Sequence, residues 1–391
     1  MSAIIIVGSG LAGYTLAKEL RKTDKETPIT IITRDDGRFY SKPMLSNGLS
    51  KNKTADQLAT QTAEQMAESQ QLTVLTDTEV ASINVNDQSV SVDGRTGSQT
   101  IEYSHLVLAL GASQIRLPIE GDGVDSILTV NDLADYAVFR DRLESAQRVA
   151  LIGPGLIGCE FANDLVSIGK KVTVIGPDKW PLERLMPQMA GEALKGVLSG
   201  QGVSWILGNV VKRVDSVSGG FQLTLDNGDT LEADLVLSAA GLVSNTALAA
   251  DAGLAINRGV VVDQYLRTSH NNVYALGDCA EICGLVMPYV MPIMIGAKAL
   301  AKTLGGEATK ANFPAMPVAV KTPSHPIVVS PPADFGAGDW DSEAAEGDPQ
   351  NGVKSRFVDA EGTLLGFTLT GSTVIEKMVL QRELPAVLPD E

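Results

Sequence analysis

Short apolar runs alternate with amphipathic segments near the start of the chain. Ile4–Val7 and Leu106–Leu110 are uninterrupted apolar runs, which are typical of strands buried on both faces of a parallel sheet. Leu11–Arg21 carries leucines at helical spacing, and Ile29–Thr33 follows a Thr-Pro break as the next strand. The pattern therefore predicts a βαβ unit, in which a helix joins two parallel strands.

The same alternation returns in the middle of the chain. Val149–Ile152 and Val172–Ile175 are predicted as buried strands with a helix over Leu156–Ile168 between them. Between the two units, Ala55–Ser69 is predicted as a largely solvated helix. After the second unit, three short runs predict an antiparallel meander: Val210–Val214, Phe221–Leu225 and Thr230–Ala233.

The composition changes from Phe313 onward. Prolines crowd together, and an acidic, glycine-rich stretch follows over Asp334–Asp348, which is expected to form exposed loops. Val353–Val358 and Leu364–Leu369 are predicted to pair as strands, and a final helix is predicted over Thr373–Glu383. This part of the chain is expected to form a third, smaller α+β unit.

Two glycine fingerprints follow the first strand of each unit. The first is Gly8-Ser9-Gly10-Leu11-Ala12-Gly13, and the second is Gly153-Pro154-Gly155-Leu156-Ile157-Gly158. Such glycines permit a tight strand-to-helix turn and let the backbone approach a pyrophosphate, which sits at the N-terminus of the helix. One fingerprint is weak evidence. Two in one chain indicate two bound dinucleotides, the arrangement that hydride transfer between a flavin and a nicotinamide requires.

Carboxylates stand about 20 residues after each fingerprint, where a Rossmann unit binds the ribose hydroxyls. In the first unit the position falls on Asp35, with Arg34 before it and Asp36 as an alternative. In the second unit it falls on Asp178, beside Lys179. The acidic residue favours NAD and the basic one favours NADP, so the choice stays open here with NAD preferred.

The segment from Thr268-Ser269 to Val273-Tyr274-Ala275-Leu276-Gly277-Asp278 is the most specific string in the chain. It predicts a strand that delivers Gly277 and Asp278 at its carboxyl end, the edge at which open α/β sheets bind ligands. Gly277 lets the chain approach the flavin side chain, and Asp278 accepts hydrogen bonds from ribityl hydroxyls. A plain Gly-Asp turn after a strand is the alternative.

Composition narrows the function classes. The 391 residues carry a net charge of −16, which argues against a nucleic-acid partner or an anionic membrane surface. No apolar run is long enough for a transmembrane helix, so the cytoplasm is the expected location. The three cysteines are expected to be small core residues. The three histidines are expected to be structural residues with their hydrogen bonds satisfied, and no bound metal is expected.

These motifs, with the strand Leu106–Ala112 and the residues Arg116 and Pro118, resemble the FAD-dependent pyridine-nucleotide oxidoreductase family over residues 1–305. A rubredoxin-reducing branch of that family is similar over the whole chain. The closer likeness rests on three groups of strings: Asp35–Arg38 with Ser41–Ser46, Gly158–Leu165, and Val320–Pro323 with Ser330–Pro332.

The resemblance implies an α/β fold with two Rossmann-like, three-layer ββα dinucleotide-binding domains and a small C-terminal α+β domain. The FAD-binding domain is discontinuous, over residues 1–115 and 239–312. The NAD-binding domain spans 116–238, and the C-terminal domain spans 313–391. A monomer or weak homodimer is expected.

The resemblance also assigns roles by position. Lys42, with Pro43, lies beside the flavin ring near N5, where an ammonium stabilises the anionic reduced flavin. Glu160 faces the junction of flavin and nicotinamide, and Lys321 reaches the flavin from the C-terminal domain. Without the resemblance, the lysines are solvated and Glu160 is a favourable charge at a helix N-terminus. Further contacts with FAD or NAD are implied at Ser9, Leu11, Ala12, Arg34, Val80, Gly111, Arg116, Leu156, Ile157, Gly241 and Val290.

The loop Ser41–Ser46 contains no cysteine, although disulfide reductases and peroxidases of this superfamily carry one or two there. The electrons from NADH therefore leave from the flavin itself, singly, to an iron protein. Rubredoxin is the acceptor that the resemblance implies. Two alternatives are a reductase of a [2Fe–2S] ferredoxin and a flavin-binding redox-signalling protein with slow turnover.

Overall fold

The computed structural model describes residues 3–95 and 97–388. Its first sheet is parallel, with the strand order β20-β9-β1-β2-β5. Its strands are β1 (Ile4–Val7), β2 (Ile29–Ile32), β5 (Thr73–Leu75), β9 (His105–Leu108) and β20 (Val273–Ala275). Because β20 pairs with β9, the chain returns to this sheet after building the second one. The βαβ unit predicted near the N-terminus is confirmed.

Helices and an antiparallel sheet complete the first unit. The helices α1 (Leu11–Thr23) and α8 (Val290–Leu304) pack against each other, and α3 (Ala63–Gln70) contacts α1. The strands β6 (Glu79–Asn84), β7 (Ser89–Gly94) and β8 (Gly97–Glu102) form a separate three-stranded sheet. Apolar side chains from all these elements share one buried core around the parallel sheet. The polar face of α3 lies outside this core.

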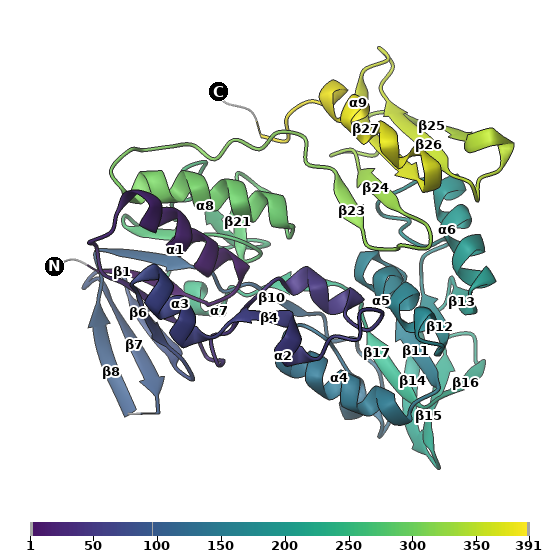
Figure 1. The fold of residues 1–391 in the computed structure, drawn as a ribbon, viewed down its shortest axis with the longest axis horizontal. Helices are drawn as coiled ribbons and strands as arrows, with labels where there is room; N and C mark the ends of the chain where they lie inside the picture. Colours follow the sequence, from purple (N-terminus) through teal and green to yellow (C-terminus); the bar gives the residue numbers. More distant parts are fainter. Residues whose placement is uncertain (1–2, 96, 389–391) are drawn as a thin grey trace.

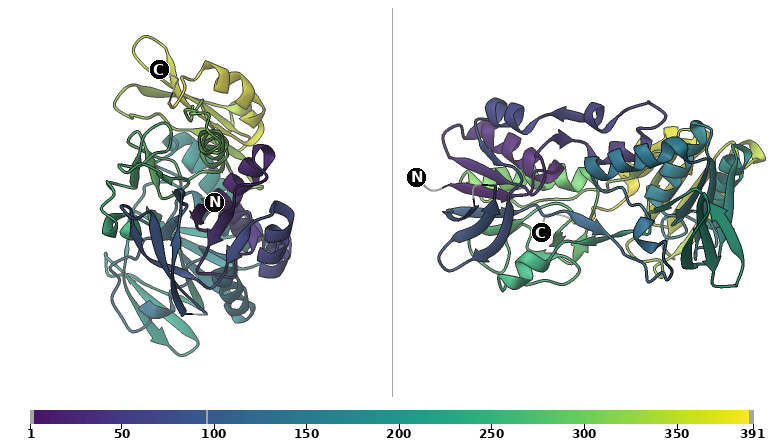
Figure 2. Two further views of the ribbon diagram at one scale, coloured as in Figure 1. Left: turned by 90° about the vertical axis from the view of Figure 1, so that its left-hand side faces the viewer. Right: turned by 90° about the horizontal axis from the view of Figure 1, so that it is seen from below.

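The second parallel sheet has the order β13-β12-β11-β17. Its strands are β11 (Arg148–Ile152), β12 (Lys171–Gly176), β13 (Val203–Leu207) and β17 (Leu235–Ser238), with the helices α4 (Leu133–Ser145), α5 (Leu156–Ser167) and α6 (Gln188–Gly200). The predicted meander is confirmed as β14 (Val211–Val217), β15 (Gly220–Leu225) and β16 (Thr230–Ala233). In the right-hand view of Figure 2, the first unit and the second unit follow one another along the long axis of the molecule.

The C-terminal unit is a five-stranded antiparallel sheet with the order β23-β24-β27-β26-β25 (Figure 1). Its elements are β23 (Val318–Val320), β24 (Ile327–Ser330), β25 (Asp339–Ala344), β26 (Val353–Val358), β27 (Leu364–Thr370) and the helix α9 (Lys377–Glu383). The prediction that residues 334–348 form only exposed loops was wrong, because β25 pairs with β26. Trp340 packs edge-on against Phe357, with ring centroids 5.3 Å apart, and this contact holds the acidic strand on the sheet.

The single helix predicted over residues 55–69 was also wrong. The segment contains α2 (Ala55–Leu58), the short strand β4 (Ala59–Gln61) and α3. Thr54 and Thr62 each form a capping box, so a second helix starts where the first was expected to continue. β4 pairs with β3 (Phe39–Tyr40), which lies just before the 3₁₀ helix η1 (Lys42–Asn47).

Shorter elements connect the two parallel sheets. β10 (Ala112–Gln114) pairs antiparallel with β18 (Leu242–Ser244), at the two crossings between the first unit and the second. The remaining elements are α7 (Ala247–Asp251), β19 (Val260–Val262), β21 (Ala280–Ile282), β22 (Leu285–Val286) and the 3₁₀ helices η2 (Val124–Ser126), η3 (Ala345–Gly347) and η4 (Gly371–Glu376). Within the described residues, no helix is both long and apolar enough to cross a membrane. The α/β fold class is confirmed, while the exact domain boundaries stay a prediction.

Candidate functional site

A cavity of about 1760 Å³ runs between the two parallel sheets and reaches the C-terminal unit. Both glycine turns, η1 and the end of β23 contribute to its wall. Most of the residues predicted as site residues line it: Gly8, Ser9, Gly10, Leu11, Ala12, Arg34, Asp35, Lys42, Pro43, Val80, Gly111, Gly153, Gly155, Leu156, Ile157, Glu160, Asp178, Gly241, Asp278, Val290 and Lys321. The fold thus brings together positions from three distant parts of the sequence.

Four predicted residues do not line this cavity: Gly13, Arg116, Gly158 and Gly277. Two of them, Gly13 and Gly158, are glycines at close backbone approaches. A Cβ at Gly13 would lie 2.0 Å from the carbonyl oxygen of Gly8, and one at Gly158 would lie 1.8 Å from that of Gly153. Gly277 has φ +83° and packs against Ala12 of α1. Arg116 is exposed.

The middle glycine of each fingerprint faces open space. Gly10 and Gly155 are the N-cap residues of α1 and α5, and a Cβ built on either meets no atom within 4 Å. Neither helix has a side-chain cap or an acidic residue in its first turn. Because the first N–H groups of a helix attract anions, each turn fits a pyrophosphate group. The residues present therefore fit two dinucleotides.

Asp35 rather than Asp36 faces the cavity. The Oδ1 atom of Asp35 accepts hydrogen bonds from Thr33 Oγ1 at 2.6 Å, Ser9 Oγ at 3.1 Å and the backbone N–H of Gly37 at 2.9 Å. These bonds hold the carboxylate beside the first glycine turn. Asp36 is exposed and pairs with Arg38 at 2.7 Å. The structure thus separates the two carboxylates that the sequence left as alternatives.

Lys42 is a half-buried cation within η1, on the wall of the cavity. Burial lowers the pKa of its ammonium, while the carboxylates of Asp278, Asp132 and Asp135 oppose that shift. Burial also raises the pKa of Asp278, against the effect of Lys42. Asp132 and Asp135 were not predicted as site residues. They begin a helix 90 residues after Lys42 in sequence, and no local pattern indicates that they lie near it.

Glu160 is completely buried and accepts three hydrogen bonds from two other parts of the chain. Its Oε1 accepts the backbone N–H of Lys321 at 2.8 Å, and its Oε2 accepts the Lys321 ammonium at 2.5 Å and the hydroxyl of Ser46. Ser46 belongs to η1, and Lys321 follows β23. Sequence reasoning missed Ser46, because a lone serine in a loop carries no signal of its own.

Two expectations about the remaining candidates were wrong. Cys159 and Cys279 are buried, but Cys283 is exposed and is therefore not a core residue. His325 is 2% exposed, and its Nε2 has no hydrogen-bond partner among the described residues, so it is not fully satisfied. Burial lowers the pKa of His325, which favours its neutral form.

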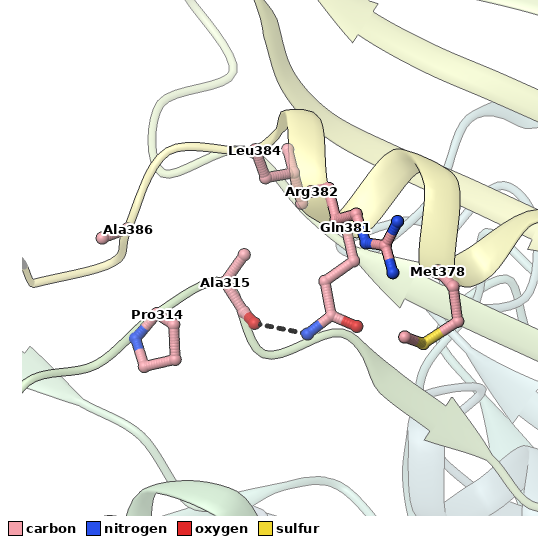
Figure 3. A pocket seen from close by; sticks show the side chains of 7 residues that line it. All are labelled: Pro314, Ala315, Met378, Gln381, Arg382, Leu384 and Ala386. Atoms are coloured by element: carbon pink, nitrogen blue, oxygen red, sulfur yellow. Dashed lines mark hydrogen bonds between the residues drawn. The ribbon is translucent and has the colours of Figure 1, made fainter.

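A second hollow, of about 370 Å³, lies against α9 (Figure 3). Its wall combines Pro314 and Ala315 of the connecting segment with residues of α9 and the chain after it. Gln381 Nε2 donates to the carbonyl oxygen of Ala315 at 2.9 Å, so the helix is tied to the connection. Neither glycine turn contributes to this hollow.

Comparison with known proteins separates the first two units from the C-terminal unit. A family model described as pyridine nucleotide-disulphide oxidoreductase matches residues 2–301, and one described as rubredoxin binding C-terminal domain matches residues 310–384. The rubredoxin-NAD(+) reductase of Alcanivorax borkumensis is 48% identical over 390 residues, which cover all of both chains. That of Acinetobacter baylyi is 44% identical over 396 residues, covering 100% of this chain and 99% of the relative.

Among solved structures, the ferredoxin reductase for the CYP199A2 system from Rhodopseudomonas palustris superimposes with a TM-score of 0.87. The match covers 100% of this chain and 96% of that one, at 24% sequence identity. At this identity the likeness establishes a common fold and carries no argument about the acceptor.

Proposed function

The chain belongs to the pyridine nucleotide-disulphide oxidoreductase family, and on that premise we propose that it oxidises NADH through bound FAD and reduces rubredoxin. In the net reaction, one NADH and two oxidised rubredoxins give NAD⁺, two reduced rubredoxins and one proton. One observation carries this proposal. A single cavity is lined by both glycine turns and by Lys321 of the segment matched to the rubredoxin-binding model.

The first unit supplies the groups that would hold FAD. The pyrophosphate fits the turn at Gly10, and Asp35 is held in place to accept the ribose hydroxyls. Asp278 lies at the carboxyl edge of β20, where it can accept hydrogen bonds from the ribityl chain. FAD would supply the chemistry that amino acids lack, since it accepts a hydride and releases single electrons.

The second unit supplies the groups that would hold NADH. Gly155 leaves room for its pyrophosphate, and Asp178 lines the same cavity. Glu183 also lines it and accepts the backbone N–H of Lys179 at 2.8 Å. Asp178 and Glu183 disfavour the 2′-phosphate of NADPH, whereas Arg184, which also lines the cavity, would attract it. The two relatives are named for NAD(+). We therefore favour NADH as the donor.

Two charged residues line the cavity and would act on hydride transfer. The ammonium of Lys42 would stabilise negative charge on the reduced flavin ring. Glu160 lies at the start of α5, on the same helix whose N-terminus would bind the NADH pyrophosphate, and would orient the nicotinamide. The protein contributes position and electrostatics, because the redox chemistry belongs to the cofactors.

Two measurements test the proposal. The purified protein should be yellow and should bleach anaerobically on addition of NADH. Turnover should then be compared with rubredoxin and with a [2Fe–2S] ferredoxin at equal concentrations, with NADH and NADPH as donors. Equal or faster ferredoxin turnover would contradict the assignment of the acceptor. Bleaching that takes minutes would favour the redox-signalling alternative. Cytoplasmic location and a monomeric or weakly dimeric state stay predictions.

A further inference from the structure

The helix α5 carries three buried polar side chains on one face. Glu160, Asn163 and Asp164 are 0%, 4% and 2% exposed. Residues three and four positions apart share a helix face, so the three form one stripe. Such side chains are rarely buried in a helix without partners. The stripe begins one turn after Gly155, the N-cap at which the nicotinamide dinucleotide would bind.

Each member of the stripe binds another unit of the chain. Asn163 Oδ1 accepts the backbone N–H of Ser324 at 3.2 Å, next to the bonds between Glu160 and Lys321. The carboxylate of Asp164 binds the first unit of the chain. Its Oδ2 accepts the backbone N–H of Leu49 at 2.8 Å, and its Oδ1 accepts that of Ser50 at 2.9 Å.

The two amides that Asp164 binds come two and three residues after the end of η1, the segment that carries Lys42. The same segment is attached to α5 a second time, because the Ser46 hydroxyl donates to Glu160. η1 therefore has two side-chain anchors on the helix that starts at the nicotinamide turn. One anchor, Glu160, lies on the cavity wall, while the other, Asp164, does not.

We propose that Asp164 is a positioning residue for hydride transfer, which fixes the distance between the flavin side and the nicotinamide side of the cavity. This inference rests on the proposed function. Hydride transfer requires the reacting atoms to lie about 3–3.5 Å apart, and a misplacement of about 1 Å costs roughly a hundredfold in rate. Two backbone N–H groups donate charge-assisted hydrogen bonds to the buried carboxylate of Asp164 and hold η1 at one register on α5. Asp164 touches neither cofactor site, so its effect passes through η1.

The test compares Asp164→Asn with Glu281→Gln in the FAD-loaded protein. Glu281 is a matched control, because it is 3% exposed and accepts the backbone N–H groups of Arg258 and Gly259, far in sequence from η1. Both changes keep the side-chain shape and replace one carboxylate oxygen by an NH2 group. At Asp164 this leaves one backbone amide without its acceptor, because Oδ1 and Oδ2 each accept one. At Glu281 the NH2 group can face the Asn257 side chain, because Oε2 accepts both backbone amides. A merely structural role predicts similar effects of the two variants on function.

For Asp164→Asn, we expect the limiting rate of flavin reduction by NADH to fall by about tenfold or more, with the NADH dissociation constant within about twofold of wild type. Reoxidation of dithionite-reduced flavin by ferricyanide should not change. Independently of activity, hydrogen exchange at the Leu49 and Ser50 amides should accelerate by about tenfold. Glu281→Gln should leave the reduction rate and both amides within about twofold of wild type.

If the Asp164→Asn protein does not bind FAD, the Asp164→Glu variant tests the positioning role instead. The longer carboxylate keeps both acceptor oxygens but displaces η1, so the limiting rate should still fall by about threefold or more. Equal reduction rates in Asp164→Asn and Glu281→Gln, or an unchanged rate in Asp164→Glu, would overturn the positioning role alone. A wild-type flavin that NADH does not reduce would overturn the proposed function, and this inference with it.

Discussion

Lys321 binds both oxygens of Glu160, with its backbone N–H at 2.8 Å from Oε1 and its ammonium at 2.5 Å from Oε2. The two residues are 161 positions apart and belong to different units. The Glu160 side chain is 0% exposed, whereas that of Lys321 is 27% exposed. The C-terminal unit is thus joined to the second unit at the wall of the cavity, through an ion pair of unequal burial.

The unequal burial predicts unequal effects of removing either partner. Lys321→Met leaves a fully buried carboxylate without its cation, which costs about 3–5 kcal/mol. Glu160→Gln leaves an ammonium that can turn toward water, so the loss is smaller, about 1–3 kcal/mol. Urea unfolding of the two variants measures the difference. The double variant should lose less than the sum of the two. Equal losses in the single variants would contradict this account of the pair.

Lys42→Ala should make the flavin harder to reduce. A charge-assisted contact contributes about 1.5–3 kcal/mol, which corresponds to a potential more negative by about 30–65 mV for a two-electron couple. Reduction by NADH should slow as well. Equilibration with a reference dye of known potential measures the shift. Lys25→Ala is the control, because Lys25 is exposed and does not line the cavity. An unchanged potential in Lys42→Ala would remove the proposed role of this lysine.

Asp278→Asn should stabilise the cofactor-free protein at neutral pH. Burial raises the pKa of Asp278 above its ordinary value of 3.8. The folded state therefore binds this proton more tightly than the unfolded state does. The stability that results is complete below about pH 3.8 and is lost as the pH rises through the folded pKa.

Asparagine does not ionise, so the Asp278→Asn variant does not lose this stability as the pH rises. The variant and wild type should have similar melting temperatures near pH 4, and the variant should melt higher by roughly 2 °C at pH 7. Scanning calorimetry across this range checks the trend, with Asp125→Asn at an exposed position as the control. FAD affinity should fall in Asp278→Asn. A gap in melting temperature that narrows with rising pH has the opposite sign and would refute the argument.

Substitution by alanine should have different effects on stability at two glycines of the second turn, Gly155 and Gly158. A Cβ at Gly155 enters open space, so Gly155→Ala should fold with an unchanged melting temperature. The methyl group would occupy the pyrophosphate position, and the KM for NADH should rise by about tenfold or more. At Gly158 the Cβ would lie 1.8 Å from the Gly153 carbonyl oxygen, so Gly158→Ala should lose about 1–3 kcal/mol of stability or fail to fold. A destabilised Gly155→Ala with normal KM would contradict the assignment.

Local chemistry was predictable where a short segment determines its own conformation. The strand–turn–helix units around Gly8 and Gly153 were predicted from apolar runs and glycine spacing, and both occur as expected. Local patterns failed where a helix cap or the pairing with a neighbouring strand determines the secondary structure. Thr62 starts a new helix within the segment predicted as one, and the acidic strand β25 forms because β26 offers it a partner.

Within the candidate site, the choice between Asp35 and Asp36 depended on contacts. Their positions in the sequence are adjacent, and only the hydrogen bonds from Ser9 and Thr33 select Asp35. The carboxylates near Lys42 could not be predicted either, because Asp132 reaches that lysine only through the packing of α4 between the units.

The amino-acid sequence alone determined two glycine turns between a strand and a helix, since a glycine's freedom and a strand's apolar run act over a few neighbouring residues. Only the tertiary structure decided which charges meet between those turns. Asp164 binds the amides after η1, and Glu160 binds Lys321, across separations of more than a hundred residues. A buried carboxylate must find a donor, and which donor it finds depends on how the three units pack.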